Sequence, residues 1–405
     1  MTPRILHRCA SWLPQTENWV YNQVRFCNGQ FEQHVACLAV ENLDRFPWPS
    51  LHPFPESSLL GRLRRTRLPG LRGRATELPW LWQRLRQLRP MVVHSHFGDY
   101  AYGAASLISR MGINHVVTFY GYDLSRLPRL HPEWRRLYAK LFRRAQLFLC
   151  EGPHMAECLV ALGCPEAKVK VHHLGVETER IPFSPRQWDP DKPLRVLIAA
   201  SFREKKGIPY ALRALAKVRE QLPLEITIIG DASGHEKDQQ EKAKILSLLG
   251  ETGLQNCTRL LGYQPHSVLW QEAAKHQVFM QPSITASDGD TEGGAPVGLI
   301  EMAASGMAIV STRHCDIPGV VLDKETGLLA DERNVEELAA HLLWFARHRE
   351  AWGGLLIRGR QHVERSFNCV IQGQKLSAIY TGLLDCKLQG CENESVHADL
   401  TTSPP

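Results

Sequence analysis

The chain has 405 residues, of which 43% are hydrophobic and 22% charged, which excludes a disordered, collagenous or coiled-coil chain and predicts about two to three globular domains. No apolar run reaches the ~18 residues of a membrane span. Arg4, His7 and Arg8 stand where a signal peptide would be apolar, so we expect a cytoplasmic protein. The 11 cysteines form no C-x-x-C pair and predict reduced thiols, not a disulfide or zinc framework.

The net charge of +6 is spread unevenly, because residues 1–190 carry +10 and residues 191–405 carry −4. Arginines concentrate at 62–67, 72–89 and 126–144, where Trp82 and Trp134 are interleaved with them. Two interpretations stay open: an ordinary solvated face, or a face that meets an anionic surface, either the inner face of the membrane or a phosphorylated acceptor. Nucleic acid is not predicted as a partner, because no recognised binding motif accompanies the charge.

Short β-branched runs alternate with longer segments of helical period, a pattern typical of parallel βα units. In the first half we expect strands at residues 4–10, 34–40, 91–96, 115–120, 147–151 and 169–173. Residues 1–180 are therefore assigned to a first Rossmann-like domain. The prolines of residues 181–193 resist both helix and central strand, so this segment is the predicted linker.

The second half repeats the pattern, with strands expected at 195–200, 225–230, 259–262, 278–281, 308–312 and 327–329. Residues 194–365 predict a second Rossmann-like domain. A helix over 366–387 is expected to pack back toward the first domain, and residues 388–405 to form a disordered tail. The α/β fold predicted is thus two Rossmann-like domains facing each other across a ligand-binding cleft. Neither half contains G-x-G-x-x-G after a strand, so dinucleotide binding is not predicted.

The most informative segment is the acidic glycine loop and helix of residues 288–306. Pro296 suits the first helical position. The free N–H groups of that helix start, beside Gly293 and Gly294, predict a phosphate site. Glu301 lies ~7 Å along the helix at ~1.5 Å per residue. Since this is about the distance from a β-phosphate to the ribose of a nucleoside diphosphate, Glu301 is a candidate ribose ligand.

This segment closely resembles the Glu-x7-Glu motif of glycosyltransferase family 4, a large group of retaining enzymes with the GT-B fold. The resemblance implies that Glu301 binds the donor ribose and that Glu292 faces the donor sugar. Eight residues separate Glu292 from Glu301 where the family has seven. Either Glu292 or the position of Gly293 therefore fills the role of the first Glu.

Further segments resemble the same family in order over residues 10–385. The run Ser201–Gly207 resembles the stretch whose Arg and Lys clamp the donor diphosphate. Lys206 matches that Lys, and Arg203 is expected to reach the phosphates because Ser201 occupies the usual Arg position. Two cations suit a leaving group that gains negative charge as the glycosidic bond breaks.

Residues 93–98 and 118–123 resemble the two loops of the first domain that face the donor sugar and the acceptor. Of the two histidines in the first loop, His96 is preferred to His94 as the candidate site residue. Many relatives have His where this chain has Tyr120. A phenol with a pKa of ~10 cannot replace an imidazole as a base near neutral pH, so we expect Tyr120 to be a positioning hydrogen-bond donor.

The resemblance implies a retaining glycosyltransferase that moves a sugar from a nucleotide-diphosphate donor to an exopolysaccharide or lipid-linked oligosaccharide, most like members that build colanic acid. The expected catalytic residues are Lys206, Arg203, Glu292, His96 and Tyr120. The expected donor-binding residues are Glu301, Gly293, Gly294, Ala295, Pro296, Val297, Gly121, Asp123 and Ser201. The implied reaction is a front-face attack in which the departing phosphate takes the acceptor proton. No cofactor and no metal ion are expected.

Three other interpretations remain. The sequence Asp288-Gly-Asp290 has the form of the Asp-x-Asp metal site of the other major glycosyltransferase fold. A different enzyme on the same fold, such as a sugar-nucleotide epimerase or a phosphorylase-like protein, is the second, because fold does not fix chemistry. The third is a non-catalytic subunit of a polysaccharide assembly complex that binds a sugar nucleotide or a membrane surface.

Overall fold

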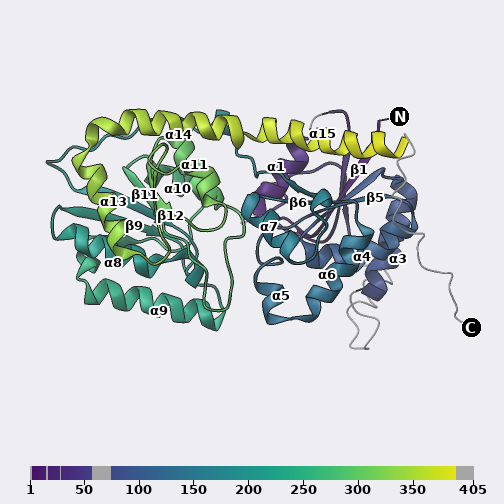
Figure 1. Ribbon diagram of the computed structural model, residues 1–405, viewed down its shortest axis with the longest axis horizontal. Coiled ribbons are helices and arrows are strands. Elements are labelled where there is room, and N and C mark those ends of the chain that lie inside the picture. The colour runs from purple at the N-terminus through teal and green to yellow at the C-terminus, as the bar shows by residue number, and fades with distance from the viewer. Residues whose placement is uncertain (1, 15–16, 28, 57–73, 389–405) are drawn as a thin grey trace, which may run out of the picture.

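The computed structural model describes residues 2–14, 17–27, 29–56 and 74–388. Figure 1 shows two domains side by side, with one long helical segment running along both. The arginine-rich stretch at 62–67 lies outside the described residues. So does the predicted tail, apart from Leu388 at the end of the last helix.

The first domain is built on a seven-stranded parallel sheet in the order β3-β2-β1-β4-β5-β6-β7. Its strands are β1 (Arg4–Trp12), β2 (Glu32–Val40), β3 (Leu51–Pro53), β4 (Val92–His96), β5 (Asn114–Thr118), β6 (Leu147–Cys150) and β7 (Val169–Val171). Its helices are α1 (Asn18–Phe26), α3 (Arg74–Leu88), α4 (Gly98–Arg110), α5 (Arg126–Leu130), α6 (Glu133–Arg144) and α7 (Pro153–Ala161). The sequence pattern predicted every strand except β3, a three-residue edge strand that ends in proline.

Local sequence explains why these elements form. The central strands β4 and β5 are buried along their whole length, as expected of strands covered by helices on both faces. Helix α6 buries Tyr138, Leu141 and Phe142, which recur at helical spacing, and leaves Arg135 and Arg136 exposed.

The second domain is built on a six-stranded parallel sheet in the order β10-β9-β8-β11-β12-β13. Its strands are β8 (Leu194–Ala199), β9 (Leu224–Ile229), β10 (Thr258–Leu260), β11 (Val278–Gln281), β12 (Ala308–Thr312) and β13 (Leu328–Ala330). Its helices are α8 (Ile208–Arg219), α9 (Glu236–Glu251), α10 (His266–Ala273), α11 (Val297–Ser305), α12 (Ile317–Val320), α13 (Val335–Arg347) and α14 (Trp352–Ser366). Together the two sheets confirm the predicted pair of Rossmann-like domains.

Two segments join the domains. Residues 181–193 contain no helix or strand, and Arg186 within them donates hydrogen bonds to the carbonyl oxygens of Ala273 and His276 in the second domain. After α14 the chain returns to the first domain as α15 (Cys369–Leu388). Tyr380 of α15 packs in the core of the first domain, and its hydroxyl oxygen lies 2.6 Å from His94 Nδ1. Helix α15 lies along the first domain (Figure 1).

The strand order fixes where a ligand should bind. In each sheet the order reverses beside the first strand of the domain, between β1 and β4 and between β8 and β11. In open parallel sheets, ligands bind outside the carboxyl ends of the strands at such a reversal. The loops that follow β5 and β6 meet those that follow β11 and β12 at the domain boundary. This boundary holds the candidate site.

Candidate functional site

The loop between β11 and α11 carries the acidic glycine segment. Helix α11 begins at Val297, one residue later than predicted, because Pro296 has an extended ψ of 129° and precedes the helix as its N-cap residue. Gly306, with φ of 86°, ends the helix as expected. No described residue accepts a hydrogen bond from the N–H groups of Gly294 and Ala295, so both are available to a ligand at the start of α11.

Glu292 is held by three neighbours. Lys206 Nζ donates to its Oε2 at 2.7 Å, and Ser283 Oγ donates to its Oε1 at 2.7 Å. Its backbone N–H donates to His314 Nε2 at 3.2 Å, while His314 Nδ1 donates to Glu332 at 2.6 Å. Burial alone would raise the pKa of Glu292, but the ammonium groups of Lys206 and its neighbour outweigh burial and lower that pKa to about 2. Glu292 is therefore ionised and held in one position by its hydrogen bonds.

A second ion network lies beside the first. Asp290 accepts hydrogen bonds from Arg203 at 2.8 Å and from Lys205 at 3.3 Å. Lys205 is buried, whereas the Arg203 side chain is 37% exposed. Lys205 and Lys206 end the 3-10 turn at Glu204–Lys206. The loop after β8 thus supplies Arg203 and Lys205 to Asp290, and Lys206 to Glu292. Sequence reasoning singled out Lys206 and missed Lys205, although the Lys-Lys pair was visible.

Asp288 links the two domains. It pairs with Arg126 of α5 at 3.1 Å and with Lys237 of α9 at 3.0 Å. Behind these groups lies a cavity of about 630 Å³ that is also lined by Ser201 and Arg203. Asp288 and Asp290 thus pair with cations from different elements.

Glu301 of α11 lines a different cavity from that of Asp288 and Asp290. Its carboxylate is 3.2 Å from His266 Nε2, and this hydrogen bond raises the pKa of His266. Both residues line a cavity of about 570 Å³ with Trp270 and Val297 of the second domain and Trp19 of the first. An acceptor carboxylate beside two indole rings suits a nucleoside. The sequence pattern gave no signal for His266 or Trp270.

The predicted histidine and tyrosine of the first domain lie deeper than expected. His96 Nδ1 is 2.6 Å from the Tyr120 hydroxyl group, and His96 Nε2 is 3.1 Å from His7 Nδ1. His94 binds Thr118 and Tyr380. Burial lowers the pKa of His96 well below its usual range and raises that of Tyr120. These side chains form a neutral hydrogen-bonded chain inside the first domain, and the structure does not bring His96 to the cleft surface.

Asp123 stabilises the loop that follows β5. Its two oxygens accept hydrogen bonds from the N–H groups of Tyr120, Gly121 and Gly98, which holds the loop after β5 against the start of α4. Gly121, with φ of 119°, then touches Gly293 of the second domain: a Cβ built on Gly293 would lie 2.3 Å from Gly121 Cα. Neither position tolerates a side chain, so the domains meet here backbone to backbone.

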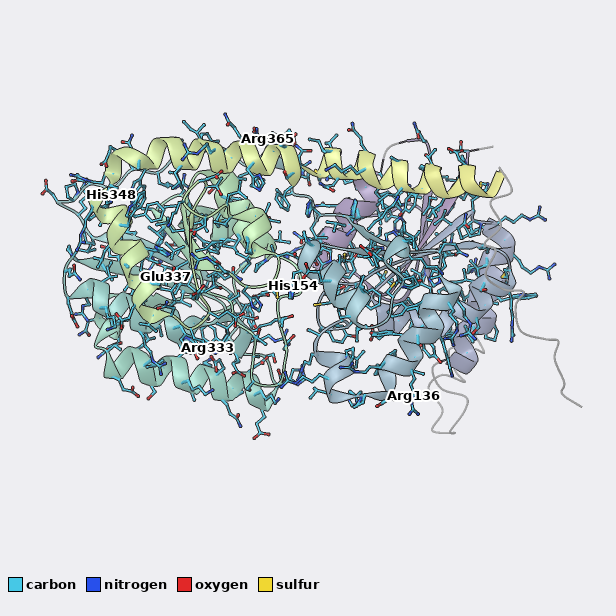
Figure 2. The ribbon with its side chains drawn as sticks, viewed as in Figure 1. Arg136, His154, Arg333, Glu337, His348 and Arg365 are labelled. Carbon is cyan, nitrogen blue, oxygen red and sulfur yellow. The ribbon has the colours of Figure 1, made fainter. Side chains whose placement is uncertain are left out.

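At the neighbouring contact Asp316 of the second domain accepts hydrogen bonds from the N–H groups of His154 and Met155 at the start of α7. Figure 2 shows His154 at the boundary between the domains. The structure thus brings Gly121 together with the loop residues Glu292 and Gly293, and it places Glu301 and Ser201 at two different cavities.

Comparison with known proteins identifies the family. Residues 16–180 match the family described as Glycosyltransferase Family 4, and residues 181–352 match the one described as Glycosyl transferases group 1. The amylovoran biosynthesis glycosyltransferase AmsK of Erwinia amylovora is 32% identical over 288 residues, which is 70% of this chain and 68% of AmsK. The chain belongs to glycosyltransferase family 4. WcaL of Escherichia coli, a protein named for colanic acid biosynthesis, is 31% identical over 73% of this chain and 71% of its own length.

Solved structures agree on the fold of this family 4 glycosyltransferase. Anabaena Alr3699/HepE, solved in complex with UDP, has a TM-score of 0.75 at 15% identity and covers 94% of this chain and 100% of HepE. The lipopolysaccharide outer core galactosyltransferase WaaB has a TM-score of 0.67 at 16% identity and covers 94% of this chain and 100% of WaaB. The predicted GT-B fold is thereby confirmed. Every helix among the described residues is too short or too polar to span a membrane.

Proposed function

We propose that this family 4 glycosyltransferase transfers a sugar from a nucleotide-diphosphate donor to a glycan or lipid-linked glycan in exopolysaccharide synthesis, with retention of configuration and without a metal ion. The observation that carries the proposal is the Lys206–Glu292 pair beside the open N–H groups at the start of α11. The names of AmsK and WcaL support the acceptor class, and the UDP complex of HepE supports the donor class.

The donor diphosphate would lie at the start of α11. Unpaired N–H groups and the helix dipole favour an anion there. Lys206 and Arg203 would add positive charge, which counts most as the leaving diphosphate becomes more negative. The ribose would then reach Glu301 in the 570 Å³ cavity, with the base near Trp270.

The protonation states support a mechanism without a general base from the protein. Glu292 stays ionised, because its pKa is about 2. It can accept hydrogen bonds from sugar hydroxyl groups and stabilise positive charge at the anomeric carbon. His96 is buried, neutral and bonded at both nitrogens, so it is poorly placed to take a proton from an acceptor. The departing phosphate is the remaining base.

The charges around the Asp-x-Asp sequence favour a metal-independent reaction. Asp288 and Asp290 already pair with four cations, among them Arg126, Arg203 and Lys205. A divalent ion would have to displace them. This argues against the alternative based on the other glycosyltransferase fold.

We also propose that the first domain rests on an anionic membrane. Arg135, Arg136, Lys140 and Arg143 are exposed along one face of α6, and Leu130 at the end of α5 is 47% exposed. Arg136 projects from the edge of the domain in Figure 2. Each cation near an anionic surface contributes about 1 kcal/mol, so four would give a salt-sensitive attachment.

Vesicle co-sedimentation tests the membrane proposal. The wild type should bind vesicles that contain phosphatidylglycerol and not neutral ones, and a variant with these four residues changed to Gln should lose that binding. Equal binding of both proteins, or none at low salt, would leave α6 as an ordinary solvated face.

The donor proposal is tested by incubating the purified enzyme with a panel of nucleotide sugars and a lipid-linked glycan acceptor. Release of a nucleoside diphosphate together with a product whose anomeric configuration matches the donor, seen by NMR, is the expected result. An inverted product would refute retention, and absence of turnover with the whole panel would favour a binding subunit.

A further inference from the structure

Four carboxyl groups gather where the domains meet: Asp123, Glu151, Glu292 and Asp316. Three of them have hydrogen-bond partners. Glu292 accepts from Lys206 and Ser283, Asp123 from three backbone N–H groups, and Asp316 from two at the start of α7. Among the residues that the structure describes, none donates a hydrogen bond to the Glu151 carboxyl group. Glu151 is therefore the acid at this boundary that is free to bind a ligand.

Glu151 is held at the donor loop by its surroundings. It follows directly after β6, and its carbonyl oxygen accepts a hydrogen bond from His173 Nδ1 at 2.6 Å. Its side chain lies on Gly294 of the other domain: a Cβ built on Gly294 would be 1.9 Å from Glu151 Oε2. Glu151 thus lies directly against the loop that leads into α11. It also borders a small cavity of about 20 Å³ that it shares with Ala295.

The chemistry of Glu151 selects the kind of ligand. Burial first, and then the nearby charges of Asp316, Asp123 and Glu292, raise its pKa well above the usual range. A neutral carboxylic acid has one O–H donor and an acceptor oxygen. A sugar hydroxyl group also offers one donor and two acceptor sites, so the two groups can bond in either direction. A phosphate would gain no charge attraction here.

We propose that Glu151 is a specificity-determining residue of the donor site, which hydrogen-bonds a hydroxyl group of the transferred sugar when the domains are closed. The inference rests on the proposed function, because it assumes a nucleotide-sugar donor at the start of α11. The second domain would bind the nucleotide, and the first domain would recognise the sugar through a hydrogen bond from Glu151. Sequence reasoning gave this acid no role.

The proposal is tested by comparing the affinity for a donor with that for the same nucleotide without its sugar. The probes are the nucleotide sugar that binds most tightly in a panel beginning with UDP-glucose, and the matching nucleoside diphosphate. Kd is measured calorimetrically without acceptor. Glu151→Leu keeps the size of the side chain and removes its polar atoms, Glu151→Gln keeps one donor and one acceptor, and Glu157→Leu on the exposed face of α7 is the matched control.

In Glu151→Leu we expect the Kd for the nucleotide sugar to rise about tenfold, because a buried hydroxyl group is left without a partner. The Kd for the nucleoside diphosphate should change less than about twofold. Glu151→Gln should lose about threefold for the nucleotide sugar, and Glu157→Leu should match the wild type for both probes. Thermal melts check that each variant is folded.

Two results would overturn the inference. If the Kd for both probes rises equally in Glu151→Leu, Glu151 only supports the loop. If the Kd is unchanged for both probes, Glu151 does not contact the donor. In either case turnover of the donor by the wild type would leave the proposed function standing. If no nucleotide sugar in the panel binds the wild type, the proposed function fails and this inference fails with it.

Discussion

Replacing Lys206 by methionine tests the proposed site most sharply, because one change removes a cation from both the donor diphosphate and Glu292. The Lys206 and Glu292 side chains are 16% and 6% exposed, and their charged atoms are 2.7 Å apart. Removing one partner of a buried pair costs about 3–5 kcal/mol. We expect the lower end for the free energy of unfolding, since Lys205 and Ser283 still face Glu292.

The catalytic loss should be larger than a folding defect can explain. Loss of one preorganised group that stabilises transition-state charge costs about 2.7–4 kcal/mol, or about 10² to 10³-fold in kcat. We therefore expect kcat/KM for donor turnover to fall at least about 100-fold at a temperature where the variant remains folded by circular dichroism.

The matched control is Lys217→Met on α8, where Lys217 pairs with Glu336 at 2.9 Å on the surface. Exposed pairs contribute about 0–1 kcal/mol, so this variant should keep wild-type kinetics. A loss of less than about fivefold in Lys206→Met, or an equal loss in both variants, would refute the assignment of Lys206 to the diphosphate.

Four further predictions follow from the same geometry. Glu301→Gln should raise the donor Kd about tenfold or more by weakening hydrogen bonds to the ribose, and an unchanged Kd by calorimetry would remove Glu301 from the site. Arg203→Ala should reduce kcat/KM less than Lys206→Met does, and a larger reduction would show that the roles are reversed. Because the pKa of Glu292 is lowered in the folded state to about 2, its contribution to stability is complete above pH ~5 and is lost as the pH falls toward ~2. Over that pH range, urea titrations should show the free energy of unfolding falling by about 3 kcal/mol less in Glu292→Gln than in the wild type. Chelator treatment should leave turnover intact, whereas loss that Mn²⁺ or Mg²⁺ restores would support a metal site at Asp288.

The sequence was sufficient for the fold because the strands are short apolar runs bounded by turns. Strands β11 and β12 match their predicted residues 278–281 and 308–312. Pro282 follows the end of β11, and Gly306 lies just before β12, so a helix- or strand-breaking residue marks each boundary. Strand β3 was missed because its three residues carry no periodic signal. Its pairing with β2 is a tertiary contact.

Site residues could be proposed from the sequence only where one segment carries its own signal. The loop and helix of residues 288–306 have such a signal in their spacing, so Glu301, Gly293 and Gly294 could be proposed as donor-binding residues. Lys205, His266 and Glu151 were not singled out, because their contacts exist only in the folded chain. Lys205 meets Asp290 and His266 meets Glu301 within the second domain, and Glu151 meets Gly294 across the domain boundary. His96 shows the reverse case. Its place at a strand end suggested the cleft, but its partners, His7 on β1 and Tyr120 in the loop after β5, hold it inside the first domain, and the sequence alone does not show these contacts.

A crystal structure of the protein with a nucleoside diphosphate is the decisive test of the proposed donor site. We expect ribose hydroxyl groups within hydrogen-bond distance of Glu301, and a diphosphate that contacts Lys206 and the N–H groups of Gly294 and Ala295. A nucleotide bound instead in the 630 Å³ cavity beside Asp288, or a metal ion between Asp288 and Asp290 in contact with the diphosphate, would contradict it.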